Sequence, residues 1–503
     1  MRNFKALRPS AIASGFLAAV LWAAASPLSA APPASELPET PFSPLLKQVS
    51  ADANVLVMID AERIRRTEFA RSIAASEGDA SASSHIVARS EVSQILLAAH
   101  IRGFRESMID WQTALLLTNT EPSVAGVAAN YGGSVEEVGP TEYAVLPYGA
   151  VAVSTGKNIL AVLTPPDRQQ VSRIVRLAKT TKPAPPSEFL VSTVSQLGPK
   201  ADALIAVDLE GMFARSQILG YVQSSETFRD KANARIGAAN VLETLKSMTI
   251  RVRFRDQPTA ELTLEFSKPV PDTTAWGKDL FEEVLSDTGA WISDIENWQA
   301  RREDNRVILE GPLSLSGLRQ MFSLVEFPTE VPSEYQPDAK LSPEEEKRRM
   351  AKASLARFRA CDKLVEDLKK DNKAKSQRAG ENALWFDRYA RQIEVLPSLN
   401  VDPEVLEYCD DVVLRLRVQA TRYRMASLRI SQEQTQPSYF WGYFTNYYGN
   451  TYSYWTRQES DAARTKRYER AGAAMDRAEQ FQAIAEEGVK VRRSMTDKYK
   501  AEF

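Results

Sequence analysis

The sequence has few of the residues on which catalysis and metal binding usually depend. Its 503 residues include two histidines and two cysteines. The H-E-x-x-H pattern of metalloproteases, the Cys-x-x-Cys pairs of zinc sites and the G-x-S-x-G elbow of serine hydrolases are all absent. Zinc sites built from His and Cys therefore lack enough ligands. We expect no metal and no cofactor, and a protein that is not an enzyme.

Two weak matches to catalytic patterns have simpler structural explanations. Residues 154–157 read Ser-Thr-Gly-Lys, which fits S-x-x-K. They lie between two predicted strands without the companion motifs, which favours a hairpin turn. His85 falls in a Ser-rich loop, and His100 falls on a predicted helical stretch beside Arg102. We expect both histidines at the surface.

The chain also lacks a surplus of either charge, and it has no long apolar run beyond the one near its N-terminus. Its 63 basic and 65 acidic side chains argue against a nucleic-acid partner. The N-terminus has a basic start, an apolar stretch over 11–25 and small residues at 29–31. This pattern is typical of a signal peptide over residues 1–31. An uncleaved anchor is the alternative, but the stretch is shorter than the roughly 20 residues that span a bilayer.

The sequence therefore predicts an exported protein, periplasmic or extracellular, with no transmembrane segment after signal cleavage. The two cysteines, Cys361 and Cys409, lie in a helical C-terminal region. In an oxidising compartment they can form a disulfide if their helices bring the α-carbons within about 7 Å. Two buried, unpaired thiols are the alternative.

Residues 51–180 resemble residues 200–328 at a nearly constant offset. The run 53–62 aligns with the run 201–210, 148 positions later, and both are short apolar segments that end in Asp-x-Glu. Residues 159–165 align in the same way with residues 307–312, and an amphipathic segment follows each of these two runs. Equal spacing of two different patterns predicts an internal duplication.

Each half is predicted to hold several strands with helices near its ends. In the first half we expect strands near 55–59, 114–118, 124–129, 144–153 and 159–163; in the second, near 204–207, 248–255, 260–266, 291–299 and 306–310. The runs 249–254 and 261–266 alternate apolar and polar residues around Asp256-Gln257-Pro258, which predicts an antiparallel hairpin. The fold class is therefore α+β, with two tandem duplicated mixed α/β modules and largely antiparallel sheets. Pro-rich joints at 183–186 and 328–337 bound the modules.

Residues 341–503 are predicted to form an all-α helical bundle, coiled-coil-like in part. A capping box begins it at Ser342, with Pro343 at the first helical position. Further helices are expected over 381–395, from 402 and over 460–498. The last of these helices has only a thin apolar stripe, so we expect it to project or to associate with another chain. If the protein forms an oligomer, we expect contacts through the C-terminal helices.

Ten of the seventeen residues at 439–455 are aromatic, in a chain that is 9% aromatic. Gly442 and Gly449 argue against a continuous helix, so we expect a loop. Aromatic rings beside Asn, Thr and Ser suit a protein partner, an envelope glycan or a membrane interface. A loop that packs on itself is the alternative. The expected partner contacts are Tyr439, Trp441, Tyr443, Tyr447, Tyr448, Tyr454 and Trp455.

Two acidic pairs occupy matching positions in the two halves. They are Asp60 with Glu62 and Asp208 with Glu210. If the halves face each other, four carboxylates converge on a cleft and can act as acid and base, as in a hydrolase acting on envelope glycans. Alternatively each Asp caps the helix after its strand, and each Glu lies near the positive end of that helix.

Residues 385–393 (Trp-Phe-Asp-Arg-Tyr-Ala-Arg-Gln-Ile) and 396–403 (Leu-Pro-Ser-Leu-Asn-Val-Asp-Pro) form one further pattern. This stretch resembles a segment of exported bacterial proteins of unknown function, where it also lies in a C-terminal helical part near a Tyr-rich segment. The resemblance covers about a quarter of the chain. It implies export and helical architecture, and it carries no catalytic residues. The function predicted from the sequence is an exported, non-enzymatic binding or scaffold protein of the cell envelope.

Overall fold

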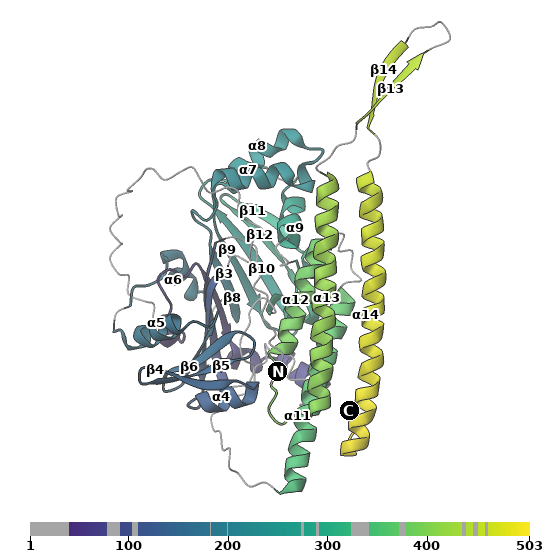
Figure 1. Ribbon diagram of the computed structural model, residues 1–503. Coiled ribbons are helices and arrows are strands. Elements are labelled where there is room, and N and C mark those ends of the chain that lie inside the picture. The colour runs from purple at the N-terminus through teal and green to yellow at the C-terminus, as the bar shows by residue number, and fades with distance from the viewer. Residues whose placement is uncertain are drawn as a thin grey trace. The chain divides into compact units, whose positions relative to one another are not determined.

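The computed structural model in Figure 1 describes most of the chain from residue 40 onward. The described ranges are 40–77, 91–102, 109–181, 183–198, 200–272, 276–287, 291–322, 342–371, 379–434, 439–445, 451–457 and 461–503. The predicted signal peptide over 1–31 and His85 lie outside them, as do Tyr447 and Tyr448.

A large antiparallel sheet dominates the first two thirds of the described chain. Its twelve strands lie in the order β11-β12-β10-β9-β8-β1-β2-β3-β7-β6-β5-β4. The strands are β1 (Val55–Asp60), β2 (Val92–Ile101), β3 (Ile109–Thr118), β4 (Ser134–Val138), β5 (Thr141–Leu146), β6 (Ala150–Gly156), β7 (Ile159–Thr164), β8 (Ala203–Asp208), β9 (Leu245–Arg253), β10 (Thr259–Phe266), β11 (Gln299–Glu303) and β12 (Arg306–Pro312).

Strands from both sequence halves therefore share one sheet, with β1 and β8 paired near its middle. Met58 lies opposite Leu204, and Val57 lies opposite Ile205. Successive residues of β1 enter different apolar clusters, Val57 and Ile59 on one face and Leu56 and Met58 on the other. Both faces of the central strands are thus buried, which explains why β1 and β8 are continuous apolar runs in the sequence.

Helices cover the two faces of the sheet. Helices α1, α5 and α6 supply Leu45, Ile174 and Leu190 to the cluster around Leu56, whereas α2 and α4 supply Ile64 and Val127 to the cluster around Val57. The helices in this part are α1 (Ser43–Leu46), α2 (Ala61–Arg65), α3 (Glu68–Glu77), α4 (Val124–Tyr131), α5 (Arg168–Lys179), α6 (Glu188–Val194), α7 (Arg215–Ser224), α8 (Arg235–Leu242), α9 (Gly277–Asp287) and α10 (Leu315–Phe322), with short 3₁₀ turns η3 (Glu226–Phe228), η4 (Ala232–Ala234) and η5 (Ser293–Asn297).

Some predicted elements are confirmed and others are wrong. The hairpin at 249–266 is present as β9 and β10, with Leu262 opposite Ile250. The strand predicted at 124–129 is instead helix α4, because Ser123 caps its start and Gly132, at φ 68°, ends it. The predicted strand at 144–153 is two strands that turn at Gly149, with φ 79°. The stretch around His100, predicted helical, is strand β2.

The C-terminal region forms the predicted helices, α11 (Pro343–Asp371), α12 (Ala379–Glu394), α13 (Pro403–Gln434) and α14 (Asp461–Tyr499). The capping box is confirmed, since Glu345 N–H donates to Ser342 Oγ at 3.3 Å and Ser342 N–H donates to Glu345 Oε2 at 2.9 Å. Helix α14 does not project over its C-terminal half. Its Phe481, Ile484, Val491 and Met495 are buried in the shared core, and it lies beside α13 in Figure 1.

Mixed α/β architecture with a large antiparallel sheet and a C-terminal helical region is thus established. None of the described helices combines the length and the apolar character that crossing a bilayer requires.

Candidate partner-binding surface

The structure does not bring the four predicted carboxylates together. Asp60 ends β1 and Asp208 ends β8, and these neighbouring strands are antiparallel. The N–H of Asp60 donates to the carbonyl of Asp202 at 3.0 Å, whereas the N–H of Asp208 donates to Asn54 at 2.8 Å. The two pairs therefore lie at opposite ends of the strands, about 20 Å apart at roughly 3.4 Å per residue.

Each carboxylate of these pairs has a local partner instead. Asp60 accepts the N–H of Arg63 at 2.9 Å and caps α2, as the capping alternative predicted. Asp208 accepts the N–H of Glu210 at 3.1 Å, but this stabilises a turn, because the next helix begins at Arg215. Burial raises the pKa of Asp60.

The two glutamates have partners of the same local kind. Glu62 pairs with Arg66 along α2, and Glu210 lies 3.6 Å from Lys246. This arrangement stabilises local structure and offers no shared catalytic cleft.

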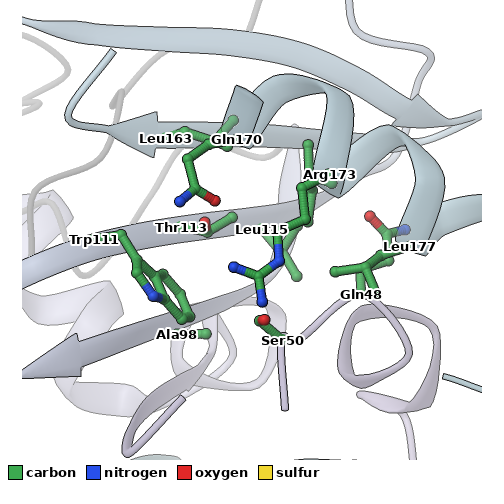
Figure 2. Close-up of a pocket in the computed structure, with 11 residues that line it drawn as sticks. Gln48, Ser50, Ala98, Trp111, Thr113, Leu115, Leu163, Gln170, Arg173 and Leu177 are labelled. Atoms are coloured by element: carbon green, nitrogen blue, oxygen red, sulfur yellow. The ribbon is translucent and has the colours of Figure 1, made fainter. Parts of the chain in front are cut away.

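A cavity beside β3 cannot hold a substrate. Its volume of about 20 Å³ holds roughly one water molecule. Figure 2 shows Arg173 of α5 directed across it toward Trp111 and Ser50. Arg173 lies 3.2 Å from Asp52, which also accepts the indole N–H of Trp111 at 3.2 Å. Burial opposes ionisation of Asp52, but hydrogen bonds from Ser50 and Trp111 and the charge of Arg173 lower its pKa overall.

The remaining ionisable site residues also have structural partners. His100 lies on β2, and its Nδ1 is 2.9 Å from Oδ2 of Asp110 on the neighbouring strand β3. Cys361 and Cys409 are free and buried on α11 and α13. Over the residues that the structure describes, no cluster of His, Cys, Asp and Glu is suited to a metal ion.

The aromatic segment forms a β-hairpin, which corrects the predicted loop. Strands β13 (Tyr439–Thr445) and β14 (Thr451–Arg457) pair antiparallel, with Trp441 opposite Trp455 and Tyr443 opposite Ser453. Tyr439 lies opposite Arg457, and Tyr454 lies opposite Gly442. Five of the seven predicted contact residues therefore fall on the described ladder. Among described residues this sheet has two strands and is separate from the twelve-stranded sheet.

The sequence contains a signal for this hairpin. In the sequence, two aromatic runs of high strand propensity flank Asn446, Gly449 and Asn450, and Asn and Gly are residue types that favour turns. Gly442 and Gly449 argue only against a helix, whereas the strand propensity of the aromatic runs is the signal that identifies the hairpin.

The helices that precede and follow the hairpin carry five of the eight large apolar residues that are exposed among the described residues. Single exposed apolar residues are ordinary, but a row at helical spacing is not scatter. Leu414, Val418 and Met425 of α13 are four and seven residues apart and so share one face. Met475 is 75% exposed and Val489 is 64% exposed on α14. The exposure of these residues could not be predicted from their spacing alone.

The fold and this surface define a mixed α/β protein with a helical region that carries an aromatic hairpin. No protein-family model matches the chain, and no curated protein does. Crystal structures of TP0453 are similar over part of it. Form III is 13% identical, with a TM-score of 0.33, and the match covers 56% of this chain and 98% of that one. Form I is 12% identical, with a TM-score of 0.32 and coverage of 55% and 95%. Similarity at this level carries no argument about function.

Proposed function

We propose that this chain is an exported, non-enzymatic binding or scaffold protein of the cell envelope, and that β13 and β14 contact a protein partner. The export half of the proposal rests on the basic, apolar and small-residue pattern of residues 1–31. The binding half rests on one observation, a two-stranded sheet whose sequence is rich in aromatic residues and carries one charged residue, Arg457, at its end.

A two-stranded hairpin is marginally stable by itself in water. Residues 439–456 include no charged side chain, although a quarter of the whole chain is charged. Tyr and Trp are enriched at binding hot spots because they bury large areas while keeping a polar group for hydrogen bonding. A partner that covers the hairpin therefore stabilises it as well as gaining affinity from it.

The strand geometry favours a protein over a glycan. Each strand of a two-stranded sheet pairs along one edge and leaves backbone N–H and C=O groups along the other. A partner protein can add a strand at such an edge while its pockets receive alternate side chains. A glycan can stack on the rings but cannot continue the ladder. The hydrolase alternative loses its support, because the carboxylates at Asp60 and Asp208 lie at opposite strand ends.

We also propose that residues 51–180 and 200–328 are duplicated modules that together build the scaffold. The order of strands supports this. Outward from the middle of the sheet, β1-β2-β3-β7-β6 in one half corresponds to β8-β9-β10-β12-β11 in the other. The central pair β1 and β8 is antiparallel, as a twofold relation between modules requires.

Fractionation of bacterial cells tests the export half of the proposal. The full chain is expected in the periplasm or the medium, with a new N-terminus close to residue 31, because the signal is removed after translocation. A variant lacking residues 2–31 is the matched control and stays in the cytosol. A full chain that remains cytosolic with its N-terminus intact contradicts the proposal.

A further inference from the structure

Helices α11 and α13 run side by side in the same direction. Ser354 Oγ on α11 accepts the N–H of Asp402 at 2.8 Å, just before α13 begins. Further along, the rings of Phe358 and Tyr408 are 5.4 Å apart, and Tyr408 donates to Asp362 Oδ1 at 3.1 Å. Because these contacts advance together along both helices, the pair is parallel.

The two cysteines lie one heptad beyond the contact between Ser354 and Asp402, each on its own helix. Cys361 is seven residues beyond Ser354, and Cys409 is seven residues beyond Asp402. Seven residues are two helical turns, so both thiols point into the same seam. Both are 0% exposed and belong to the same buried cluster of the helical region. Side chains that face each other across one seam can pair when the helices bring their α-carbons within disulfide range.

The surroundings treat the two thiols differently. The Cys361 thiol donates to Cys409, which raises the pKa of Cys361, and burial acts in the same direction. Accepting this hydrogen bond lowers the pKa of Cys409; burial opposes the change, and the Arg357 guanidinium supports it. Arg357 is itself buried and donates to the carbonyl of Pro397 at 2.9 Å. These differences apply to the folded state, in which both thiols are enclosed.

We propose that Cys361 and Cys409 form a disulfide that joins α11 to α13 when the protein folds in an oxidising compartment. The occurrence of the bond in cells rests on the proposed export, whereas its geometry does not. The oxidant is a protein or small-molecule disulfide. Either cysteine thiolate attacks one of its sulfurs, forms a mixed disulfide and releases the first thiol. The other cysteine then loses its proton, attacks the sulfur of the first and releases the second thiol, so two electrons and two protons reach the oxidant.

Burial determines when this exchange takes place. An oxidant cannot reach thiols that are fully enclosed in the folded helical region. The bond therefore forms before α11 and α13 close on each other, and folded, reduced protein oxidises slowly.

Refolding of the purified chain lacking residues 1–31 tests the proposal. After denaturation it is refolded with glutathione disulfide or with a reductant. The oxidising arm is expected to give a monomer that is two hydrogens lighter, with the Cys361 and Cys409 peptides linked. Its melting temperature rises by about 5 °C relative to the reduced arm. A variant with both cysteines replaced by alanine shows no difference between the arms.

Free thiols or disulfide-linked dimers after oxidative refolding overturn the pairing. This result needs no variant, since the wild-type chain is compared with itself. Rapid alkylation in intact cells then reports location separately. A chain that pairs when refolded but carries free thiols in cells contradicts export and leaves the pairing geometry intact.

Discussion

Replacing Trp441 and Trp455 together with alanine is expected to lower the affinity for the envelope partner by about 100-fold or more. The two residues lie opposite each other in the ladder between β13 and β14. Truncating a single aromatic hot-spot residue typically costs at least about 2 kcal/mol, which is roughly 30-fold in affinity. The measurement is the amount of partner recovered after chemical crosslinking of cells that express each variant at equal levels.

Two controls separate binding from folding in this experiment. Ile236 of α8 is 68% exposed and lies outside the hairpin, so Ile236→Ala removes an exposed apolar side chain elsewhere and is expected to leave recovery unchanged. Trp→Phe at both positions keeps an aromatic ring and retains most of the affinity. If the alanine variant recovers as much partner as the wild type, the hairpin is not the contact. The glycan alternative is favoured if the alanine variant recovers as much protein partner as the wild type but no longer sediments with purified cell-wall glycan.

Asp402→Ala is expected to destabilise the helical region by about 1–3 kcal/mol, because it removes a buried carboxylate that accepts hydrogen bonds from two elements of the bundle. Asp402 is 1% exposed and accepts from Lys498 Nζ and Tyr499 Oη, both at 2.5 Å, and from the N–H of Glu404 at 3.0 Å. It thus connects the start of α13 to the end of α14. Thermal unfolding followed by circular dichroism measures the loss. The neighbouring exposed Asp497→Ala is the control and changes stability by less than about 0.5 kcal/mol.

The same residue predicts an acid-sensitive helical region. Burial opposes ionisation of Asp402, but the hydrogen bonds from Lys498, Tyr499 and Glu404 lower its pKa below the ordinary value of 3.8. A carboxylate whose pKa is depressed in the folded state contributes stability above its unfolded pKa and loses it as the pH falls through the folded value. The difference in stability between the wild type and Asp402→Asn is therefore constant near neutral pH and shrinks below about pH 4. A difference that is as large at pH 2 as at pH 7 contradicts this assignment.

Local patterns predicted much of the fold. Alternation at 249–254 and 261–266 predicted β9 and β10, and the capping box at Ser342 predicted the start of α11. The prediction failed where periodicity does not distinguish helix from strand. Residues 92–101 form β2, yet they include several Leu and Ala residues, which favour helices, and eight of the ten are buried. Burial on both faces removes the alternation that otherwise reveals a strand.

The candidate site depended on information that the sequence does not contain. Matching positions of Asp60 and Asp208 were recognised, but their separation depends on whether β1 and β8 pair parallel or antiparallel. The antiparallel pairing places the two acids at opposite ends. The aromatic composition of 439–455 was evident from the sequence, whereas the cross-strand register between Trp441 and Trp455 required the structure.

Photocrosslinking in living cells tests the central proposal most directly. A photoreactive phenylalanine analogue is placed at Tyr443 in β13, or at Ile236 as the control position. Binding through the hairpin predicts one discrete crosslinked envelope protein from position 443, absent from position 236 and lost when Trp441 and Trp455 are alanine. An exported, correctly folded chain that yields no crosslinked protein from position 443 contradicts it.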